Sequence, residues 1–298
     1  MVDTMKYKFI FLLSITSIAL VGCDNDQSTE NKKQAQELVK HSLDNMVLVK
    51  GGEFLMGDFG PLVGDKIPFS INSDDKKLHR VVLDDFKISK YKVTNKDFNS
   101  YIKITNKEKL PPSAWGKDVL ADNVSVSIPW EMAHSYCLWL GVMSGKNVNL
   151  PTEAQWEYAA RSRGEYFPFA TNNGKLEKGV NIPTYEEKEQ MTGGLGLPYY
   201  PIGKYPPNPL GLYDMGLSGK EWIYDWYAAD YYTYSPQKNP TGPQSGKKKV
   251  LRGYAGGDYQ SALTMFRQSS LPVPVLDGSK YEEDGITPSY VFRCVVNN

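Results

Sequence analysis

The stretch Leu150-Pro-Thr-Glu-Ala-Gln-Trp-Glu-Tyr-Ala-Ala-Arg161 says more about the fold than any other part of the chain. Thr152 is a residue type that favours the position before a helix, because its hydroxyl accepts a hydrogen bond from a backbone N–H of the first turn. Trp156, Tyr158 and Ala159 then supply large and small apolar side chains that can pack. We therefore predict a packed helix that begins after Thr152.

Two further segments on the N-terminal side of this stretch predict helices. Thr94 or Asn95 is a good N-cap for a helix that continues through Tyr101. Between Ile128 and Leu140, apolar residues recur at helical spacing after a proline, which is tolerated in a first turn. The predicted apolar face of this helix comprises Ala133, Tyr136, Cys137 and Leu140.

Strands are predicted closer to the N-terminus. The segment from Met46 to Gly57 alternates apolar and polar residues on both sides of Gly51-Gly52, which predicts a hairpin around that turn. Val82, Asp84, Phe86 and Ile88 alternate in the same way and predict one strand. After Arg163 few periodic segments are recognisable.

Composition limits the classes of function. The chain has 34 Lys plus Arg and 34 Asp plus Glu, so its net charge is zero. The cluster Lys247–Lys249 lies in a Gly/Pro/Ser-rich loop, where lysines are expected to be solvated, and we predict no nucleic-acid partner. The 37 aromatic residues (20 Tyr, 11 Phe and 6 Trp), with 26 Gly and 19 Pro, indicate a loop-rich fold fixed by large rings.

The first 22 residues have the features of a secretory signal. A basic start at Met5–Lys8 precedes the apolar run Phe9–Val21, which is shorter than the roughly 20 residues of a membrane-spanning helix. Leu20–Cys23 resembles the lipobox of bacterial lipoproteins, which implies cleavage before Cys23 and lipidation of its thiol. The alternative is an ordinary cleaved signal with an incidental cysteine.

The expected organisation therefore has three parts. Residues 1–22 are a lipoprotein signal peptide, residues 23–44 are the lipidated cysteine and a polar tether, and residues 45–298 are one domain. Asp24 after the cysteine resembles a retention signal for the inner membrane, so we expect a lipoprotein that faces the periplasm; the outer membrane is the alternative. Acyl chains on Cys23 would hold the protein at a bilayer.

The other two cysteines, Cys137 and Cys294, are expected in a compartment where disulfides persist. The residues alone leave two alternatives open: one disulfide, or two buried thiols that pack as small apolar side chains.

Several short motifs occur in a fixed order along the chain. They are Met56-Gly57, Tyr91–Asn95, Pro129-Trp130, Leu150–Arg161, Pro207-Asn208, Gly211–Met215, Glu221-Trp222, Asp225–Tyr227, Arg252-Gly253 and Phe292–Cys294. Together these motifs resemble the formylglycine-generating enzyme (sulfatase-modifying factor) family. The resemblance covers roughly Met46–Asn298 and implies an α+β fold, distantly similar to C-type lectins, with little regular secondary structure.

The segment Arg252–Arg267 departs from this family where it matters for chemistry. The family carries two cysteines that perform the oxidation there, and this chain has Asp258 and Leu263 in their places, with Ala255 in place of a serine. Neither a carboxylate nor an isobutyl group can supply a thiolate. We therefore predict no catalytic residue and no enzymatic activity.

The resemblance also implies structural features. It favours a disulfide between Cys137 and Cys294. It implies structural calcium, with Asn181 and Ile182 in one matching segment and Glu221 in another, since oxygen ligands suit Ca²⁺. No other cofactor is expected. Two residues depart from the pattern: Ser218 stands in place of an asparagine, and Lys92, directly before Val93-Thr94-Asn95, stands where the family often has glutamate.

The expected function is binding of a protein partner. The hypothesis we prefer is an immunity protein that neutralises a secreted, type VI-like antibacterial effector such as a phospholipase. A structural or regulatory accessory of a secretion apparatus is the alternative within this class. Because Tyr is enriched at protein interfaces, the predicted partner surface comprises Tyr231, Tyr232, Tyr234, Tyr254, Asp258, Tyr259 and Tyr281.

A metal-dependent oxidoreductase with a changed active site is the competing class. The chain has three histidines, His41, His79 and His134, and their spacing matches no two-histidine, one-carboxylate metal motif. The metal content of the purified protein separates the two classes.

Overall fold

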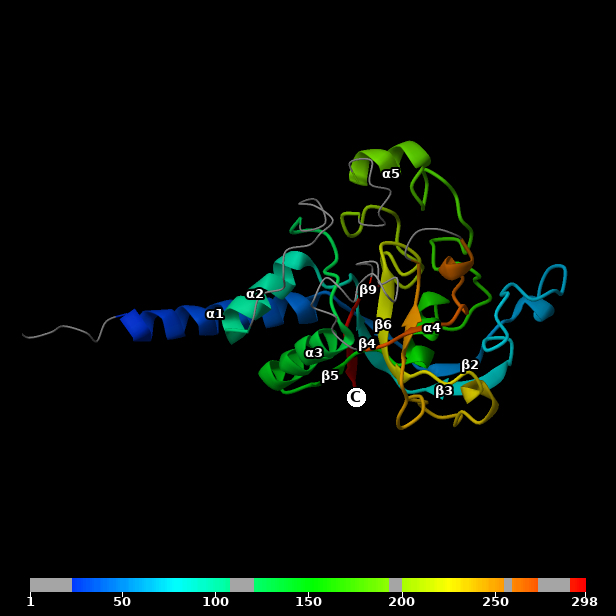
Figure 1. Cartoon of the computed structure of the whole chain (residues 1–298), viewed down its shortest axis with the longest axis horizontal. Helices are drawn as coiled ribbons and strands as arrows, with labels where there is room; N and C mark the ends of the chain where they lie inside the picture. The colour runs from blue at the N-terminus through cyan, green and yellow to red at the C-terminus, as the bar shows by residue number, and fades with distance from the viewer. Residues whose placement is uncertain (1–22, 108–120, 193–199, 255–258, 273–289) are drawn as a thin grey trace, which may run out of the picture.

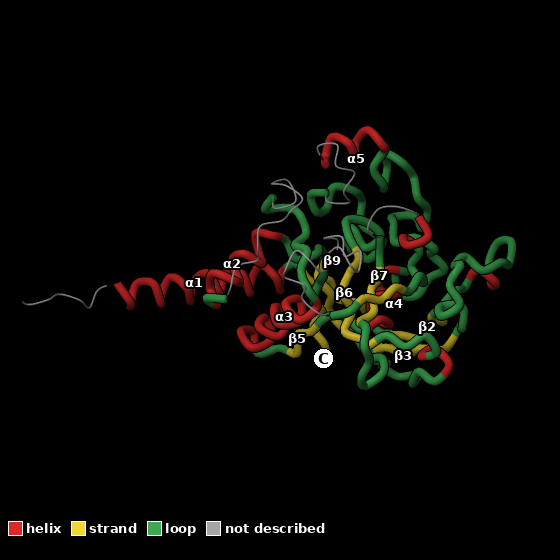
Figure 2. The backbone as a smooth tube through the Cα atoms, in the orientation of Figure 1, coloured by secondary structure: helices red, strands yellow, loops and turns green. Residues whose placement is uncertain are grey.

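The computed structural model describes residues 23–107, 121–192, 200–254, 259–272 and 290–298 (Figure 1). Five α-helices and ten strands lie in these ranges (Figure 2). The helices are α1 (Cys23–Asp44), α2 (Asn95–Thr105), α3 (Trp130–Ser144), α4 (Glu153–Ala160) and α5 (Tyr185–Thr192). The strands are β1 (Met46–Val49), β2 (Gly52–Met56), β3 (His79–Leu83), β4 (Phe86–Ser89), β5 (Asn147–Asn149), β6 (Lys220–Trp226), β7 (Lys249–Arg252), β8 (Gln268–Ser270), β9 (Tyr290–Val291) and β10 (Val295–Asn297).

The strands form three small sheets, and long loops connect them. One sheet has the order β1-β4-β10-β5, a second consists of β2 and β3, and the third has the order β8-β7-β6-β9. All pairs are antiparallel except β6 with β9. This architecture confirms the predicted α+β class with limited regular structure.

The predicted hairpin around Gly51-Gly52 is wrong. β1 pairs with β4 and β2 pairs with β3, so both long segments bend and pass from one sheet to the next. A Cβ on Gly51 would lie 2.3 Å from the carbonyl oxygen of Leu83, so the two segments cross at this glycine. Asp85 stabilises the bend, because its carboxylate accepts a hydrogen bond from the Gly51 backbone at 2.8 Å. The single strand predicted across Asp84 is therefore two strands.

The three predicted helices are confirmed. Thr94 caps α2 by accepting from the backbone N–H of Asp97, and Pro129 precedes α3. At α4, Thr152 accepts from the backbone of Gln155 at 3.2 Å, while the Gln155 side chain accepts from the Thr152 backbone at 3.0 Å. This reciprocal pair satisfies two backbone donors that the helix leaves open. Every residue of α4 is buried, which makes it the central helix of the domain.

The apolar core has two main parts. One lies around α4 and strands β2 and β3, and the other lies between α2, α3 and the sheet that contains β10. The second part includes a disulfide between Cys137 of α3 and Cys294, with Cα atoms 5.7 Å apart. The disulfide prediction is confirmed, and the bond joins α3 to the segment before β10.

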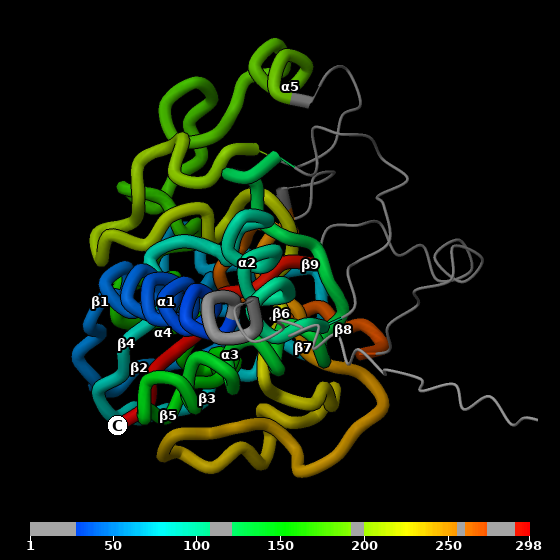
Figure 3. The backbone as a smooth tube through the Cα atoms, turned by 90° about the vertical axis from the view of Figure 1, so that its left-hand side faces the viewer, coloured from blue at the N-terminus to red at the C-terminus, as the bar shows by residue number. Residues whose placement is uncertain are grey.

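The prediction of a polar tether over residues 23–44 is wrong for its second half. This segment is the helix α1, and it packs against α2 and α3 (Figure 3). Ala35, Leu38 and Val39 lie on one side of the helix and are buried. Three apolar residues at helical spacing were enough to dock the helix, although its composition is polar. Among the residues that the structure describes, no helix is long and apolar enough to cross a membrane.

Candidate functional site

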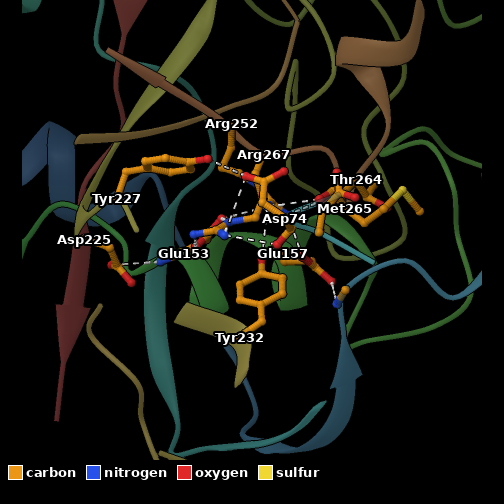
Figure 4. A network of polar contacts seen from close by, with 12 residues as sticks. Asp74, Glu153, Glu157, Asp225, Tyr227, Tyr232, Arg252, Thr264, Met265 and Arg267 are labelled. Atoms are coloured by element: carbon orange, nitrogen blue, oxygen red, sulfur yellow. Dashed lines mark hydrogen bonds and ion pairs between the residues drawn. The ribbon is translucent and has the colours of Figure 1, made fainter. Parts of the chain in front are cut away.

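The candidate site lies where the end of β7 meets α4 (Figure 4). Helical spacing places Glu153 and Glu157 on the same side of α4, one turn apart. Arg252, the last residue of β7, donates to both: its Nη1 lies 2.9 Å from Glu153 Oε1 and its Nη2 lies 2.6 Å from Glu157 Oε2. All three side chains are almost completely buried.

A second arginine binds the same glutamate. Arg267 Nε lies 2.8 Å from Glu153 Oε1 and its Nη2 lies 3.1 Å from Oε2, so the contact is bidentate. Its guanidinium also lies 4.3 Å from the centre of the Tyr232 ring and 3.7 Å from the carboxylate of Asp74. Glu153 therefore binds both ends of the segment from Arg252 to Arg267. These contacts do not involve the side chains between the two arginines.

The charges of this network are fixed. Burial alone would raise the pKa of Glu153, but the guanidinium groups of Arg267 and Arg252 outweigh burial and hold that pKa below its usual value. On the opposite side, Arg161 donates to Glu157 at 2.9 Å. Three arginines and two glutamates thus pair with one another inside the protein, although the Nε of Arg252 has no hydrogen-bond partner among the described residues. Such a network positions the backbone segments that carry these side chains.

Leu263, which the family resemblance matches to a cysteine position, is part of the apolar core. Leu263 is 4% exposed and packs in a cluster with Phe59 and Met265. The backbone of Leu263 also forms a bridge with Phe169. Its isobutyl group fills the space with carbon, so this position offers neither a thiol nor an open pocket. Asp258, at the other cysteine position, and Ala255 lie outside the described residues.

Two buried carboxyl groups flank the network. Burial raises the pKa of Asp225 to about 8, and its Oδ2 accepts from the Glu153 backbone at 3.0 Å. Burial also raises the pKa of Asp75 to about 6, and its Oδ2 accepts from the Ser70 hydroxyl at 2.6 Å. A raised pKa is common at functional sites, but both groups are buried and bonded within the protein.

Among the described residues, no group of three or more His, Cys, Asp or Glu side chains is placed to hold a metal ion. His79 stacks on Tyr232 with ring centres 4.4 Å apart, and His134 stacks on Trp130 at 4.6 Å. The two histidines of the domain thus contact different aromatic side chains.

In the described part of the chain, a groove of about 880 Å³ lies between α1, α2 and the residues around Ser89–Thr94. Leu38, Tyr136 and Leu140 contribute apolar surface to it, while His41, Lys96, Asp97 and Lys103 contribute ionisable groups. The His41 ring and the Asp97 carboxylate face each other at 3.9 Å. A groove with apolar and charged walls suits a peptide segment or a small amphipathic ligand. Sequence reasoning missed this groove, because it treated α1 as a tether.

Of the four predicted partner residues whose side chains the structure describes, three are buried. Tyr231, Tyr232 and Tyr254 are 5%, 2% and 2% exposed, so the prediction that they bind a partner is wrong. The Tyr231 hydroxyl accepts from the Gly242 backbone at 3.0 Å, and the Tyr232 hydroxyl accepts from Arg252 at 3.5 Å. Tyr234 is 56% exposed and remains available.

The described residues do not include Asp258, Tyr281 or the side chain of Tyr259, the other three members of the predicted partner surface.

The predicted calcium ligands have protein partners. Asn181 Oδ1 accepts from the Glu177 backbone at 2.8 Å, and the Ile182 carbonyl accepts from the Gly179 backbone at 2.7 Å. These bonds leave further lone pairs, and the calcium site at Asn181 and Ile182 stays a prediction. Glu221 differs, because both of its carboxylate oxygens accept from Arg293, at 2.7 and 3.0 Å.

The lysine cluster at residues 247–249 is only partly solvated. Lys247 and Lys248 are exposed, but Lys249 is 2% exposed. Its ammonium lies 3.9 and 3.8 Å from the ring centres of Trp130 and Trp226, and it donates to the Tyr224 carbonyl at 2.7 Å. Such cation–π contacts join β7 to α3 and β6. The apolar residues that follow Lys249 are the sequence signal that it begins a buried strand.

Comparison with known proteins gives a consistent result. A model of the sulfatase-modifying factor enzyme 1-like domain matches residues 30–297, and this range begins inside α1. The chain is 31% identical over 274 residues to the serine/threonine-protein kinase pkn1 of Chlamydia pneumoniae. The match spans 86% of this chain but only 38% of that relative's length.

The relatives include formylglycine-generating enzymes and one protein that is named as inactive. The chain is 27% identical over 257 residues to the inactive C-alpha-formylglycine-generating enzyme 2 of Mus musculus, covering 70% of this chain and 73% of the relative. Formylglycine-generating enzymes are also among its relatives. The fold is similar to the structure of PvdO from Pseudomonas aeruginosa, with a TM-score of 0.64, 22% identity, and coverage of 85% of this chain and 94% of that one.

Proposed function

The chain belongs to the family of sulfatase-modifying factor enzyme 1-like domains, and on this premise we propose that it binds a protein partner and performs no catalysis. Leu263 carries this proposal. The family resemblance matches it to the position of a catalytic cysteine, and it is buried in an apolar cluster with Phe59 and Met265. Oxidation of a cysteine substrate by this family needs sulfur at that position, and a leucine cannot supply it.

The retained framework supports a binding function. The arginine–glutamate network holds the ends of the 252–267 segment rigidly, although the chemistry that such a framework would serve is missing. A rigid scaffold lowers the entropy lost when a partner binds. The similarity to the inactive C-alpha-formylglycine-generating enzyme 2 of Mus musculus is consistent with a family that can keep the fold without the reaction.

The proposed location is the periplasmic side of a membrane, with Cys23 lipidated. Support comes from the basic start, the short apolar run and Leu20–Cys23 in the sequence. In the folded protein α1 begins at Cys23, and its first turns extend beyond α2 (Figure 1). A helix of this kind would hold the domain at a defined distance from a bilayer, whereas a flexible tether would not.

The partner we propose is a secreted antibacterial effector that attacks membranes, such as a phospholipase, which makes this chain an immunity protein. The groove between α1 and α2 supports a protein ligand, since it is large and has apolar and charged walls. It also lies beside the helix that leads to the anchor, so a bound effector would be held close to the membrane. An accessory role in a secretion apparatus would use the same surface.

The activity is tested with a peptide that contains the sulfatase-type Cys-x-Pro-x-Arg sequence. Incubation with the purified protein, with and without added copper, should leave the mass of the peptide unchanged. A formylglycine enzyme is the positive control. Conversion of the peptide cysteine would end the non-catalytic proposal, and so would a redox-active metal at one equivalent per purified chain.

The immunity function is tested by co-expression. The secreted protein encoded beside this gene should be toxic in the periplasm alone and harmless when this lipoprotein is present. Ser100→Trp places a large ring in the groove and should restore toxicity, because Ser100 lines it. Asn99→Trp is the matched control on the exposed side of α2. Equal toxicity with and without the lipoprotein would contradict the immunity proposal.

A further inference from the structure

The ammonium group of Lys92 lies inside a cage of oxygen atoms. Its Nζ donates to the backbone carbonyls of three successive residues: Leu217, Ser218 at 3.1 Å and Gly219 at 3.0 Å. Glu221 Oε1 lies 3.9 Å away, and neither the Lys92 nor the Glu221 side chain has any exposure. Three carbonyls and one carboxylate therefore surround a single cation that solvent does not reach.

The backbone of this turn is bent so that its carbonyls converge. Asp214, Ser218 and Gly219 have φ angles of 59°, 53° and 100°, in the region that L-residues other than asparagine and aspartate seldom adopt. A turn with several such residues is costly unless its surroundings stabilise it. Converging carbonyl dipoles also repel one another, and a cation at their centre removes that repulsion.

The charges around the cage show that it needs one positive charge. Glu221 is shared between Arg293 and Lys92. Asp214 lies close by; burial raises its pKa, whereas Lys92 and Arg293 oppose that shift. With Lys92 removed, the two acidic groups would face a single guanidinium. The buried site would then carry an electron-rich oxygen cage with no cation at its centre.

We propose that Lys92 is the resident cation of a site built for a hard metal ion, so that this chain stabilises the turn 214–221 without calcium. The oxygen ligands are of the kind that Ca²⁺ takes, namely carbonyls and a carboxylate. Calcium at Glu221, which the family resemblance implies, therefore does not fit this chain, because the protein's own ammonium occupies the position. Removing that ammonium opens the site to the metal.

The match between donor and acceptors supports this assignment. A charged lysine has three N–H donors and no acceptor, and three carbonyls accept from it here. Burial lowers the pKa of Lys92 to about 8, and the nearby Glu221 opposes the shift. The position directly before Val93-Thr94-Asn95 brings the Lys92 side chain to this turn, so a single residue supplies the cation.

The test compares Lys92→Ala with Lys92→Met. The alanine variant leaves the cage open, and the methionine variant fills the path of the side chain. In choline chloride both should melt below the wild type. At about a hundredfold excess of CaCl₂ over its Kd, the melting temperature of the alanine variant should rise by about 5–10 °C more than that of the wild type. The methionine variant should respond as the wild type does.

Lys249→Ala is the matched control for loss of a buried lysine. Lys249 donates to one carbonyl and otherwise contacts aromatic rings, so its removal creates no oxygen cage. Calcium should not restore its stability. A calcium response common to the wild type and every variant belongs to another site, such as Asn181. Calorimetry should show one additional calcium equivalent for Lys92→Ala.

Equal calcium responses of Lys92→Ala and the wild type would overturn the proposal. If the alanine variant does not fold without calcium, refolding with CaCl₂ should recover it, and failure in both conditions counts against the proposal. The wild type gives an independent measurement. With ¹⁵N-labelled lysine at pH 7, Lys92 should show a slowly exchanging NH₃⁺ resonance, and fast exchange would contradict a caged ammonium. Neither result depends on whether the protein is an enzyme or a binding protein.

Discussion

Arg252 and Glu157 form an ion pair of 2.6 Å in which neither side chain is exposed. The pair connects the end of β7 to the middle of α4 and therefore joins two parts of the fold that are far apart in sequence. A buried pair is not by itself a large source of stability, because both charges lose their hydration. Breaking it is costly, since one charge then stays buried without its partner.

We therefore predict that Glu157→Gln lowers the free energy of unfolding by about 3–5 kcal/mol. The loss also affects Arg161 and the Gly57 backbone, which donate to the same carboxylate. Urea denaturation measures the change. Glu53→Gln is the matched control at the surface pair with Arg80, and its loss of stability should be much smaller because solvent screens that pair. Equal losses at the two positions would contradict the structural role of the buried network.

Asp75→Asn should stabilise the protein at neutral pH. Burial raises the pKa of Asp75 from 3.8 to about 6, so between these values the folded state holds more protons than the unfolded state. This contribution to stability is present at low pH and is lost as the pH rises through about 6. Asparagine stays neutral, and we expect a gain on the order of 1–3 kcal/mol at pH 7.5 and none at pH 3.

The measurement is the difference in unfolding free energy between Asp75→Asn and the wild type across this pH range. Asp65→Asn is the control, because it removes the same charge from an exposed position of the same loop. A difference that does not change with pH would contradict the assignment to Asp75.

Helix α1 should behave as part of the domain. Leu38→Ala removes a side chain that is 7% exposed and should lower the unfolding free energy by about 2–3 kcal/mol. A chain that begins at Gln34 lacks only the polar start of α1 and should keep its stability within about 0.5 kcal/mol. If Leu38→Ala is also neutral, α1 does not dock as described.

The disulfide should contribute substantially. It links residues 157 positions apart, and in the chain-entropy model a loop of this length is worth about 5 kcal/mol. Replacing Cys137 and Cys294 together by serine should lower stability by a few kcal/mol. The reduced wild type is the control, and it should match the double variant. Stability that does not respond to reductant would contradict the prediction.

The sequence predicted the features that depend on neighbouring residues. The helix after Thr152 was recognisable because its cap and its packing residues lie within one short segment. The pairing of β1 with β4 was not, because it depends on the contact between Gly51 and Leu83, which no local pattern reveals. Alternation predicts that a segment is extended, but it does not identify the strand that pairs with it.

The candidate site also has features that the sequence predicts and features that depend on distant contacts. The interpretation of Leu263 as a replaced cysteine came from the order of the motifs in the sequence alone. The burial of Tyr231 and Tyr232 could not be predicted in this way, since an aromatic cluster in a Pro/Gly-rich segment suits either a core or an interface. The position of Lys92 was recognised as unusual, but its role required the three carbonyls of a turn more than 120 residues away.

The place of β10 in its sheet has a consequence for biogenesis. Residues 295–297 pair with β4 on one side and β5 on the other, so this sheet cannot close before residue 297 has left the ribosome. Pairings that span such a separation form slowly compared with local contacts. In the nascent chain, β4 and β5 should therefore stay unjoined until β10 has emerged between them.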